Sequence, residues 1–135
     1  MKHINMYLTF DGNCREAMTF YAEALGAKVD LMTFADMPNC PPGSSERVMH
    51  ARLAKGEGIL MASDTMPGMP FTMGNNSSIS IDCSSAAEVD EFTASLGAGG
   101  KVTMPPQDTF WGAYFAMLTD EFGLQWMFNF DKPKV

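Results

Sequence analysis

Apolar residues recur at helical spacing in two stretches of the chain, and short segments of alternating apolar and polar residues surround them. The first helical stripe begins behind Asn13 and the second behind Ser85, and a glutamate follows each of these residues at the third position. This is the pattern of a capping box, in which the side chains at both positions bind free backbone N–H groups. Gly26 and Gly97 end the two stripes. The pattern therefore predicts two helices.

One strand is predicted before each helix and three after it, which gives the order βαβββ in each half of the chain. Turns at residues 55–58 and 120–123 join the last two strands of each half. Prolines at residues 38–43 and 105–106 are expected to break the strands before them. The expected strands are Asn5–Asp11, Lys28–Ala35, Arg47–Leu53 and Ile59–Ser63, followed by Asn76–Asp82, Lys101–Met104, Gly112–Thr119 and Leu124–Phe130.

The two halves repeat at a nearly constant offset, because the first strand and the stop glycine recur after 71 residues and the helix cap recurs after 72. Offsets this similar across three features indicate an internal repeat. We therefore predict an α+β fold of two βαβββ modules related by pseudo-twofold symmetry. One domain spans residues 1–135, with module one at 1–66, a linker at 67–73 and module two at 74–135. Leu8 is expected to superpose on Ile79, and Met61 on Met127.

Alternation also separates two faces of the predicted sheets. One face is apolar and is expected beneath the helices, where burial is favourable. The opposite face is mixed and can line a ligand cavity, although a plain solvent-facing side of a sheet is the alternative. The mixed face is expected to carry Asn5, Tyr7, Thr9, His50, Arg52, Ile59, Met61, Ser63, Asn76, Ser78, Ser80, Tyr114, Gln125, Met127 and Asn129.

Composition narrows the possible partners and the compartment. The net charge of −7 disfavours nucleic acid and anionic membranes. The three cysteines show no metal-binding spacing, and the longest uninterrupted apolar run, Ala113–Leu118, is far too short to span a membrane. A cytoplasmic protein with reduced thiols is expected.

Three blocks of sequence resemble the PhnB-like branch of the vicinal oxygen chelate superfamily, which includes glyoxalases, bleomycin-resistance proteins and dihydroxybiphenyl dioxygenases. The blocks are residues 7–27, which include the run Arg15-Glu16-Ala17, residues 61–67, and the closing segment from Asp108 to Met127 with Phe110-Trp111-Gly112. The resemblance implies paired βαβββ modules that curve into a cleft, in a homodimer.

Metal-dependent members of that superfamily hold a divalent ion on four strand residues, typically His, Glu or Gln. The resemblance places these positions at Asn5, Met61, Asn76 and Met127. Thioether and amide groups are poor ligands for Zn, Ni or Mg. We therefore expect no metal and no cofactor, which argues against glyoxalase-type isomerisation and ring-cleaving oxygenation.

Other residues carry candidate chemistry. His50 is the candidate catalytic residue, as an acid or base with Arg52 beside it, or it is simply packed on the sheet. Trp111 and its aromatic neighbours form a ligand wall, a dimer contact or core. Cys83 at a helix entrance is either an activated thiol or a buried hydrophobe. Methionines of the linker suit adaptable packing or an apolar ligand. The glycines at 97–100 lack the spacing of a phosphate-binding loop.

These observations predict a protein that binds a small organic molecule in a metal-free cleft. The expected ligand-binding residues are Asn5, Tyr7, His50, Arg52, Met61, Ser78, Trp111, Tyr114, Met127 and Asn129. The alternative is a glyoxalase-superfamily enzyme of lyase, isomerase or oxygenase type, acting through His50, Arg52 and Tyr7. A 3-demethylubiquinone methyltransferase is the weakest alternative, because no glycine loop opens a βαβ unit.

Overall fold

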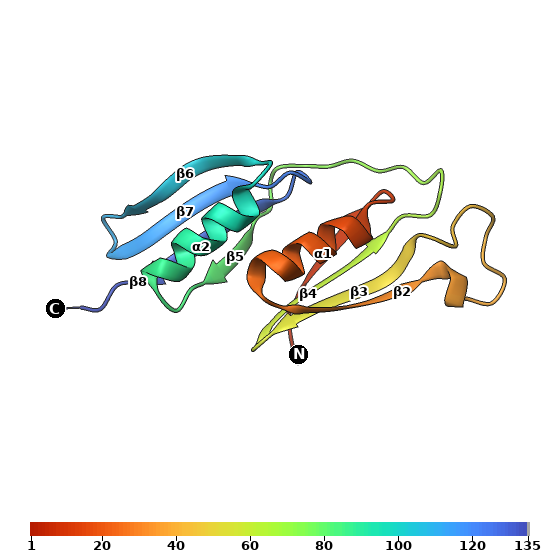
Figure 1. The fold of residues 1–135 in the computed structure, drawn as a ribbon, viewed down its shortest axis with the longest axis horizontal. Coiled ribbons are helices and arrows are strands. Elements are labelled where there is room, and N and C mark those ends of the chain that lie inside the picture. The colour runs from red at the N-terminus through yellow and green to blue at the C-terminus, as the bar shows by residue number, and fades with distance from the viewer. Residues whose placement is uncertain (135) are drawn as a thin grey trace. The chain divides into compact units, whose positions relative to one another are not determined.

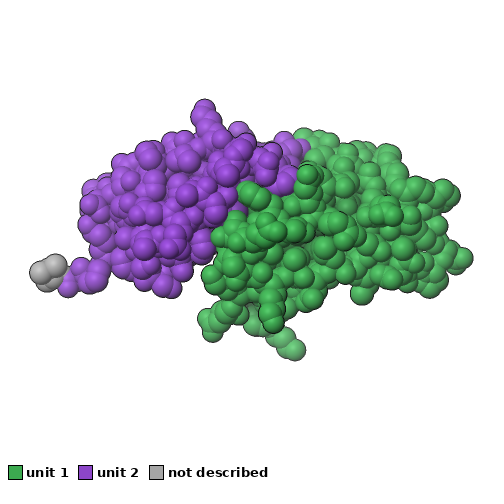
Figure 2. Space-filling model, viewed as in Figure 1, with its two compact units in different colours: residues 1–72 green, residues 73–135 purple. Residues whose placement is uncertain are grey.

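The computed structural model describes residues 1–134 and divides into two compact units, Met1–Thr72 and Met73–Val135 (Figures 1 and 2). The boundary lies at the end of the predicted linker, residues 67–73. Each unit is one βαβββ module, so the predicted α+β fold is confirmed. Neither helix in the described part of the chain is long and apolar enough to cross a membrane.

Unit 1 has a four-stranded sheet covered by one helix (Figure 1). Its strand order is β1-β4-β3-β2, with β1 parallel to β4 and the other pairs antiparallel. A turn at Gly56 and Glu57 joins β3 to β4, as predicted. The elements are β1 (Met6–Phe10), α1 (Cys14–Leu25), β2 (Lys28–Thr33), a short 3₁₀ helix (Phe34–Asp36), β3 (Val48–Lys55) and β4 (Gly58–Asp64).

Unit 2 repeats the arrangement with the order β5-β8-β7-β6. Pro105 and Pro106 do not end β6 as predicted, because the strand continues through them to Asp108 with irregular pairing to β7. An edge strand tolerates proline, since only one of its sides needs donors. The elements are β5 (Ile79–Asp82), α2 (Ala86–Gly97), β6 (Lys101–Asp108), β7 (Ala113–Thr119) and β8 (Gln125–Asp131).

Each helix covers the apolar face of its own sheet, which confirms the predicted division into two faces. In unit 1 the helix contributes Met18 and Tyr21 to a core with Leu8 and Phe10. In unit 2 the Phe92 ring of α2 lies 6.0 Å from the ring of Phe128, centroid to centroid. The other faces of the two sheets, away from the helices, are called face 1 (unit 1) and face 2 (unit 2) below.

The two helices begin differently, although the sequence predicts the same cap. Ser85 Oγ accepts the backbone N–H of Glu88 at 3.1 Å, and the Glu88 carboxylate accepts the N–H of Ser84, so the second cap is confirmed with a one-residue difference. The predicted cap of α1 is wrong, because the Asn13 side chain makes no capping hydrogen bond. The Asp64 carboxylate, at the end of β4, accepts the N–H of Cys14 at 3.0 Å instead.

The glycine stops also differ. Gly26 adopts a left-handed conformation (φ 66°), and Ala27 N–H donates to Ala22 O at 2.8 Å, as in a glycine C-cap. Gly97 stays helical, and the residue after it is extended. A Cβ at Gly97 would lie 3.3 Å from the Val102 side chain, which would have to move by a few tenths of an ångström to accommodate it.

The strand register shows that the two predicted equivalences between the modules cannot both hold. Leu8 pairs with Ala62 in unit 1, and Ile79 pairs with Trp126 in unit 2. If Leu8 corresponds to Ile79, the position equivalent to Met61 is therefore Gln125, two residues before Met127. If Met61 corresponds to Met127 instead, Leu8 corresponds to Ile81. In both cases the two methionines lie on corresponding faces, because a two-residue shift preserves the side of a strand.

Candidate functional site: the helix-free sheet faces

Face 1 carries a row of predicted site residues across the whole sheet. Tyr7 pairs with Met61, and Met61 pairs with Arg52. Arg52 pairs in turn with Asp30 at the edge strand β2. Cross-strand partners point to the same face with Cβ atoms about 4.5–5.5 Å apart. The structure therefore brings Tyr7, Met61 and Arg52 together, as the sequence predicts.

Tyr7 also forms a polar pair with His50, which lies on β3 two residues before Arg52. The Tyr7 hydroxyl lies 3.1 Å from His50 Nδ1, and the ring centroids are 5.8 Å apart. Because β4 lies between β1 and β3, the tyrosine side chain must extend across β4 to reach the histidine. Either group can donate, depending on the imidazole tautomer. Tyr7 is 47% exposed, so the pair is accessible to a ligand.

No carboxylate supports His50 within the described residues, and this limits its catalytic options. Asp64 is buried, and its oxygens accept the backbone N–H groups of Gly12, Cys14 and Val48. A general base is usually oriented by a third group, as in catalytic triads. Among the described side chains, only the phenol of Tyr7 is placed to orient His50.

Arg52 is exposed and faces Asp30 in the register, yet no ion pair joins them among the described side chains. Its guanidinium is therefore available to an anionic group, with Asp30 reducing the local positive potential. Arg47, by contrast, is committed to structure: its guanidinium donates to the Thr65 carbonyl at 2.8 Å and pairs with Asp11 at 3.4 Å. Hydrogen bonding to Thr65, with smaller contributions from Arg47, lowers the pKa of Asp11.

Three predicted residues lie outside the strands. Asn5 is exposed immediately before β1, and Asn76 and Ser78 are exposed before β5. Nothing in their unit holds Asn5 or Ser78 by a side-chain hydrogen bond in the described structure. They lie at the margins of faces 1 and 2 and are not grouped with the Tyr7–His50 pair.

Face 2 contains Met127 and Asn129, as predicted, but Tyr114 lies on the other side. Its hydroxyl donates to Asp90 of α2 at 2.7 Å, so it faces the helix. That hydrogen bond raises the pKa of Tyr114. Face 2 instead carries Phe115, which the sequence places only in the aromatic patch around Trp111, and Met117, which the sequence does not assign to a face. The sequence gives little signal for these faces, because residues 113–118 are all apolar and do not alternate with polar residues.

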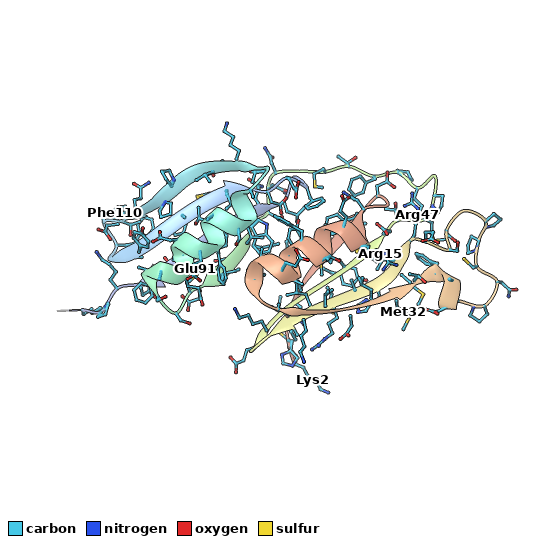
Figure 3. All side chains as sticks on the ribbon, in the orientation of Figure 1. Lys2, Arg15, Met32, Arg47, Glu91 and Phe110 are labelled. Carbon is cyan, nitrogen blue, oxygen red and sulfur yellow. The ribbon has the colours of Figure 1, made fainter. Side chains whose placement is uncertain are left out.

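The aromatic segment before β7 is highly exposed. Phe110 is 97% exposed and projects from the loop between β6 and β7 (Figure 3). Trp111 is 54% exposed, and its ring contacts Phe110 at 5.1 Å and Phe115 at 5.7 Å, both edge to face. Of the predicted roles, plain core does not apply to Phe110 or Trp111.

Cys14 and Cys83 are buried thiols. Burial raises the pKa of Cys83 to about 11 and that of Cys14 to about 12. For Cys83, the nearby carboxylates of Glu88 and Asp82 act in the same direction. The neutral, buried form of Cys83 is therefore favoured, and the alternative of a helix-activated thiol is wrong.

The residues at the family's metal positions do not fit a divalent ion. Asn5, Met61, Asn76 and Met127 offer two amides and two thioethers, without imidazole or carboxylate. In the described part of the chain, no group of three or more His, Cys, Asp or Glu side chains is arranged to hold a metal.

A family model described as the Glyoxalase/Bleomycin resistance protein/Dioxygenase superfamily matches residues 3–128. The chain belongs to this superfamily. Its relatives include Protein YjdN of Escherichia coli (strain K12), which is 32% identical over 143 residues and 97% of each chain. The resemblance drawn from the sequence is thus confirmed.

Solved structures of the superfamily show the same fold. Protein PA1353 from Pseudomonas aeruginosa is 41% identical, with a TM-score of 0.89 over 98% of this chain and 100% of that one. A PhnB protein from Bacillus cereus is 24% identical, with a TM-score of 0.78 over 96% and 99%. The description of the latter also names a 3-demethylubiquinone-9 3-methyltransferase. At this identity it supports the fold alone.

Proposed function

We propose that this glyoxalase-superfamily protein binds a small organic molecule on its helix-free sheet faces without a metal ion. The observation that carries the proposal is the accessible Tyr7–His50 pair on face 1, which is bordered by Arg52 and Met61. A sheet face that only contacts solvent has no need of a tyrosine extended over a neighbouring strand. Apolar surface with a few placed polar groups is typical of small-molecule sites.

The chemistry of face 1 suits binding better than catalysis. Tyr7 and His50 offer a donor and an acceptor, Arg52 a positive charge, and Met61 a flexible apolar surface. A divalent ion has no suitable ligands at the family positions, so Lewis-acid activation through them is not part of the proposal. The superfamily's name joins bleomycin-resistance proteins with two classes of enzyme, glyoxalases and dioxygenases.

A second candidate function is an enzyme in which His50 transfers a proton. The hydrogen bond between Tyr7 and His50 favours it, since a phenol can fix the imidazole tautomer and exchange a proton with it. The missing carboxylate argues against it. Methyl transfer is the least supported function, because no glycine-rich loop follows a strand and opens a helix in either unit.

The test is a thermal-shift screen of the EDTA-treated protein against small aromatic and aliphatic acids, amines and amides. We expect at least one class to raise the melting temperature, since only a ligand that prefers the folded state does so. Binding should weaken in Arg52→Ala or Tyr7→Phe and should persist in the exposed control Glu57→Gln. A screen without any stabilising compound, or binding that depends on added metal, would refute the proposal. Turnover that is lost in His50→Ala would establish the enzyme instead.

A further inference from the structure

Face 2 has a row of three methionines that joins three strands. Met127 of β8 pairs with Met117 of β7, and Met117 pairs with Met104 of β6. Ser80 of β5 completes the row beside Met127. Cross-strand neighbours are close enough for continuous contact. The three thioethers, each only partly buried, thus form one apolar strip that no helix of unit 2 covers.

The adjacent row places an aromatic ring between two amides. Phe115 pairs with Asn129 on one side and with Gln107 on the other. The next residue, Ala116, pairs with Phe128, whose ring contacts Phe92 of α2. Alternation therefore directs Phe115 away from the helix. Its ring is also in edge-to-face contact with the exposed Trp111, so the aromatic surface continues beyond the sheet.

The hydrogen bonds made by the two amide nitrogens leave the amide oxygens of Asn129 and Gln107 available to a ligand. Asn129 Nδ2 donates to the Asp131 carboxylate at 3.0 Å, and Gln107 Nε2 donates to the Pro105 carbonyl at 3.2 Å. Both partners can only accept, so the nitrogen of each amide must face them. Each amide oxygen then remains as an acceptor beside Phe115. Among the described residues, no hydrogen bond to either oxygen is present.

Charge further restricts what these two rows can bind. The only ionisable side chain in them is Asp82, at the β5 end of the Asn129 row. An acidic group beside the amide oxygen of Asn129 repels anions and favours hydrogen-bond donors. Methionine side chains adapt to the outline of a ring and make favourable contacts with it. The chemistry therefore matches a flat, non-anionic molecule with a donor on its edge.

We propose that face 2 binds a planar aromatic molecule bearing an N–H or O–H donor, with the ring on Met117 and Phe115 and the donor directed to the oxygen of Asn129 or Gln107. This inference rests on the proposed function, that the helix-free faces bind organic molecules, and specifies the ligand class for one of them. It also assigns roles to Met104, Gln107, Phe115 and Met117.

Indole and 1-methylindole are the probes, because they differ in the N–H donor. Methyl NMR of protein labelled at methionine Cε reports which methionines the probe touches. Indole should shift the signals of Met104, Met117 and Met127, with a dissociation constant on the order of 1 mM for so small a ligand. It should leave the signals of Met61 and of Met32, which pairs with His50 on face 1, unchanged. 1-Methylindole should bind more weakly.

Two variants and one control complete the test. Met117→Asp should weaken indole binding by about tenfold or more, since a carboxylate would have to be desolvated against the electron-rich face of the ring. Asn129→Leu should retain binding but reduce the preference for indole over 1-methylindole. Met32→Asp on face 1 should change neither the affinity nor the preference. The melting temperature of each variant establishes that it is folded.

The outcomes separate this inference from the proposed function. Shifts at Met32 and Met61 alone would uphold binding to a helix-free face but overturn the assignment to face 2. Equal binding of the two indoles would overturn the role of the donor. No shift at millimolar indole would overturn the inference, while the thermal-shift screen of other compound classes would decide the proposed function independently.

Discussion

At the scale of single residues, the buried carboxylate of Asp64 links three separate segments of unit 1. One oxygen accepts the N–H groups of Gly12 and Cys14, and the other accepts that of Val48. The negative charge also lies at the N-terminus of α1, where the helix dipole favours it. Asp64 thus takes the capping role that the sequence assigns to Asn13.

Asp64→Asn should lower the free energy of unfolding by about 1–3 kcal/mol. An amide has only one acceptor oxygen, so its NH₂ group would face a backbone N–H and leave it without a partner. Urea unfolding measures the loss. The control Asp30→Asn, on the exposed edge strand β2, should stay within about 0.5 kcal/mol of the unmodified protein. An equal effect of the two substitutions would contradict the role of Asp64.

The thiols should react very unequally. Burial raises the pKa of Cys14 to about 12 and of Cys83 to about 11, whereas Cys40 is partly exposed. An aromatic disulfide reagent at about pH 8 should modify Cys40 first, and Cys40→Ser should remove the fast reaction. All three thiols should react in denaturant. Because the folded pKa values exceed the reference of 9.0, the two buried thiols stabilise the fold below pH 9, and this contribution falls as pH rises toward 11–12.

Metal analysis of the purified protein tests whether the residues at the family's ligand positions bind an ion. With amides and thioethers at the family's ligand positions, the purified protein should hold far less than one equivalent of Zn, Ni, Mn or Fe. Added ions should leave the melting temperature unchanged, because only selective binding to the folded state would raise it. A stoichiometric ion that is lost in Met61→Ala with Asn5→Ala would contradict this prediction and favour the enzyme.

At the scale of elements, features set by neighbouring residues can be predicted from the sequence, whereas features set by contacts with distant residues cannot. The helices and strands follow from periodicity, and the cap at Ser85 follows from its own neighbours. The cap of α1 comes from Asp64, some 50 residues away, and no local pattern reveals it. Tyr114 was misplaced for a similar reason, since its hydrogen bond to Asp90 and the register of β7 depend on tertiary packing.

The two helix caps therefore predict opposite results for similar substitutions. Ser85→Ala should cost about 1 kcal/mol, because the Glu88 N–H loses its partner. Asn13→Ala should cost far less, since its side chain makes no capping bond. Paired urea unfolding curves measure the difference. A larger loss for Asn13→Ala would restore the capping box that the sequence predicts and would contradict the role of Asp64.

At the scale of the whole molecule, each unit buries one face of its sheet with its own helix and leaves the other face and the sheet edges uncovered. β6 is a poor edge for pairing, because it carries two prolines and irregular register. β1 has neither a proline nor a charged residue within Met6–Phe10. A chain of this size with exposed aromatic side chains has reason to associate.

We expect a homodimer, a prediction that also follows from the resemblance to the superfamily. Light scattering at micromolar concentration should give about twice the chain mass of 14.8 kDa.

Phe110 is 97% exposed, so Phe110→Ser should leave the fold intact while removing apolar area from any contact it makes. If the aromatic segment is the contact, this variant should dissociate at higher concentration than the unmodified protein, whereas Met69→Ser, in the segment between β4 and β5, should not. A monomer at every concentration would refute the dimer. A dimer insensitive to Phe110→Ser would leave Trp111 and Phe115 free for a ligand on face 2.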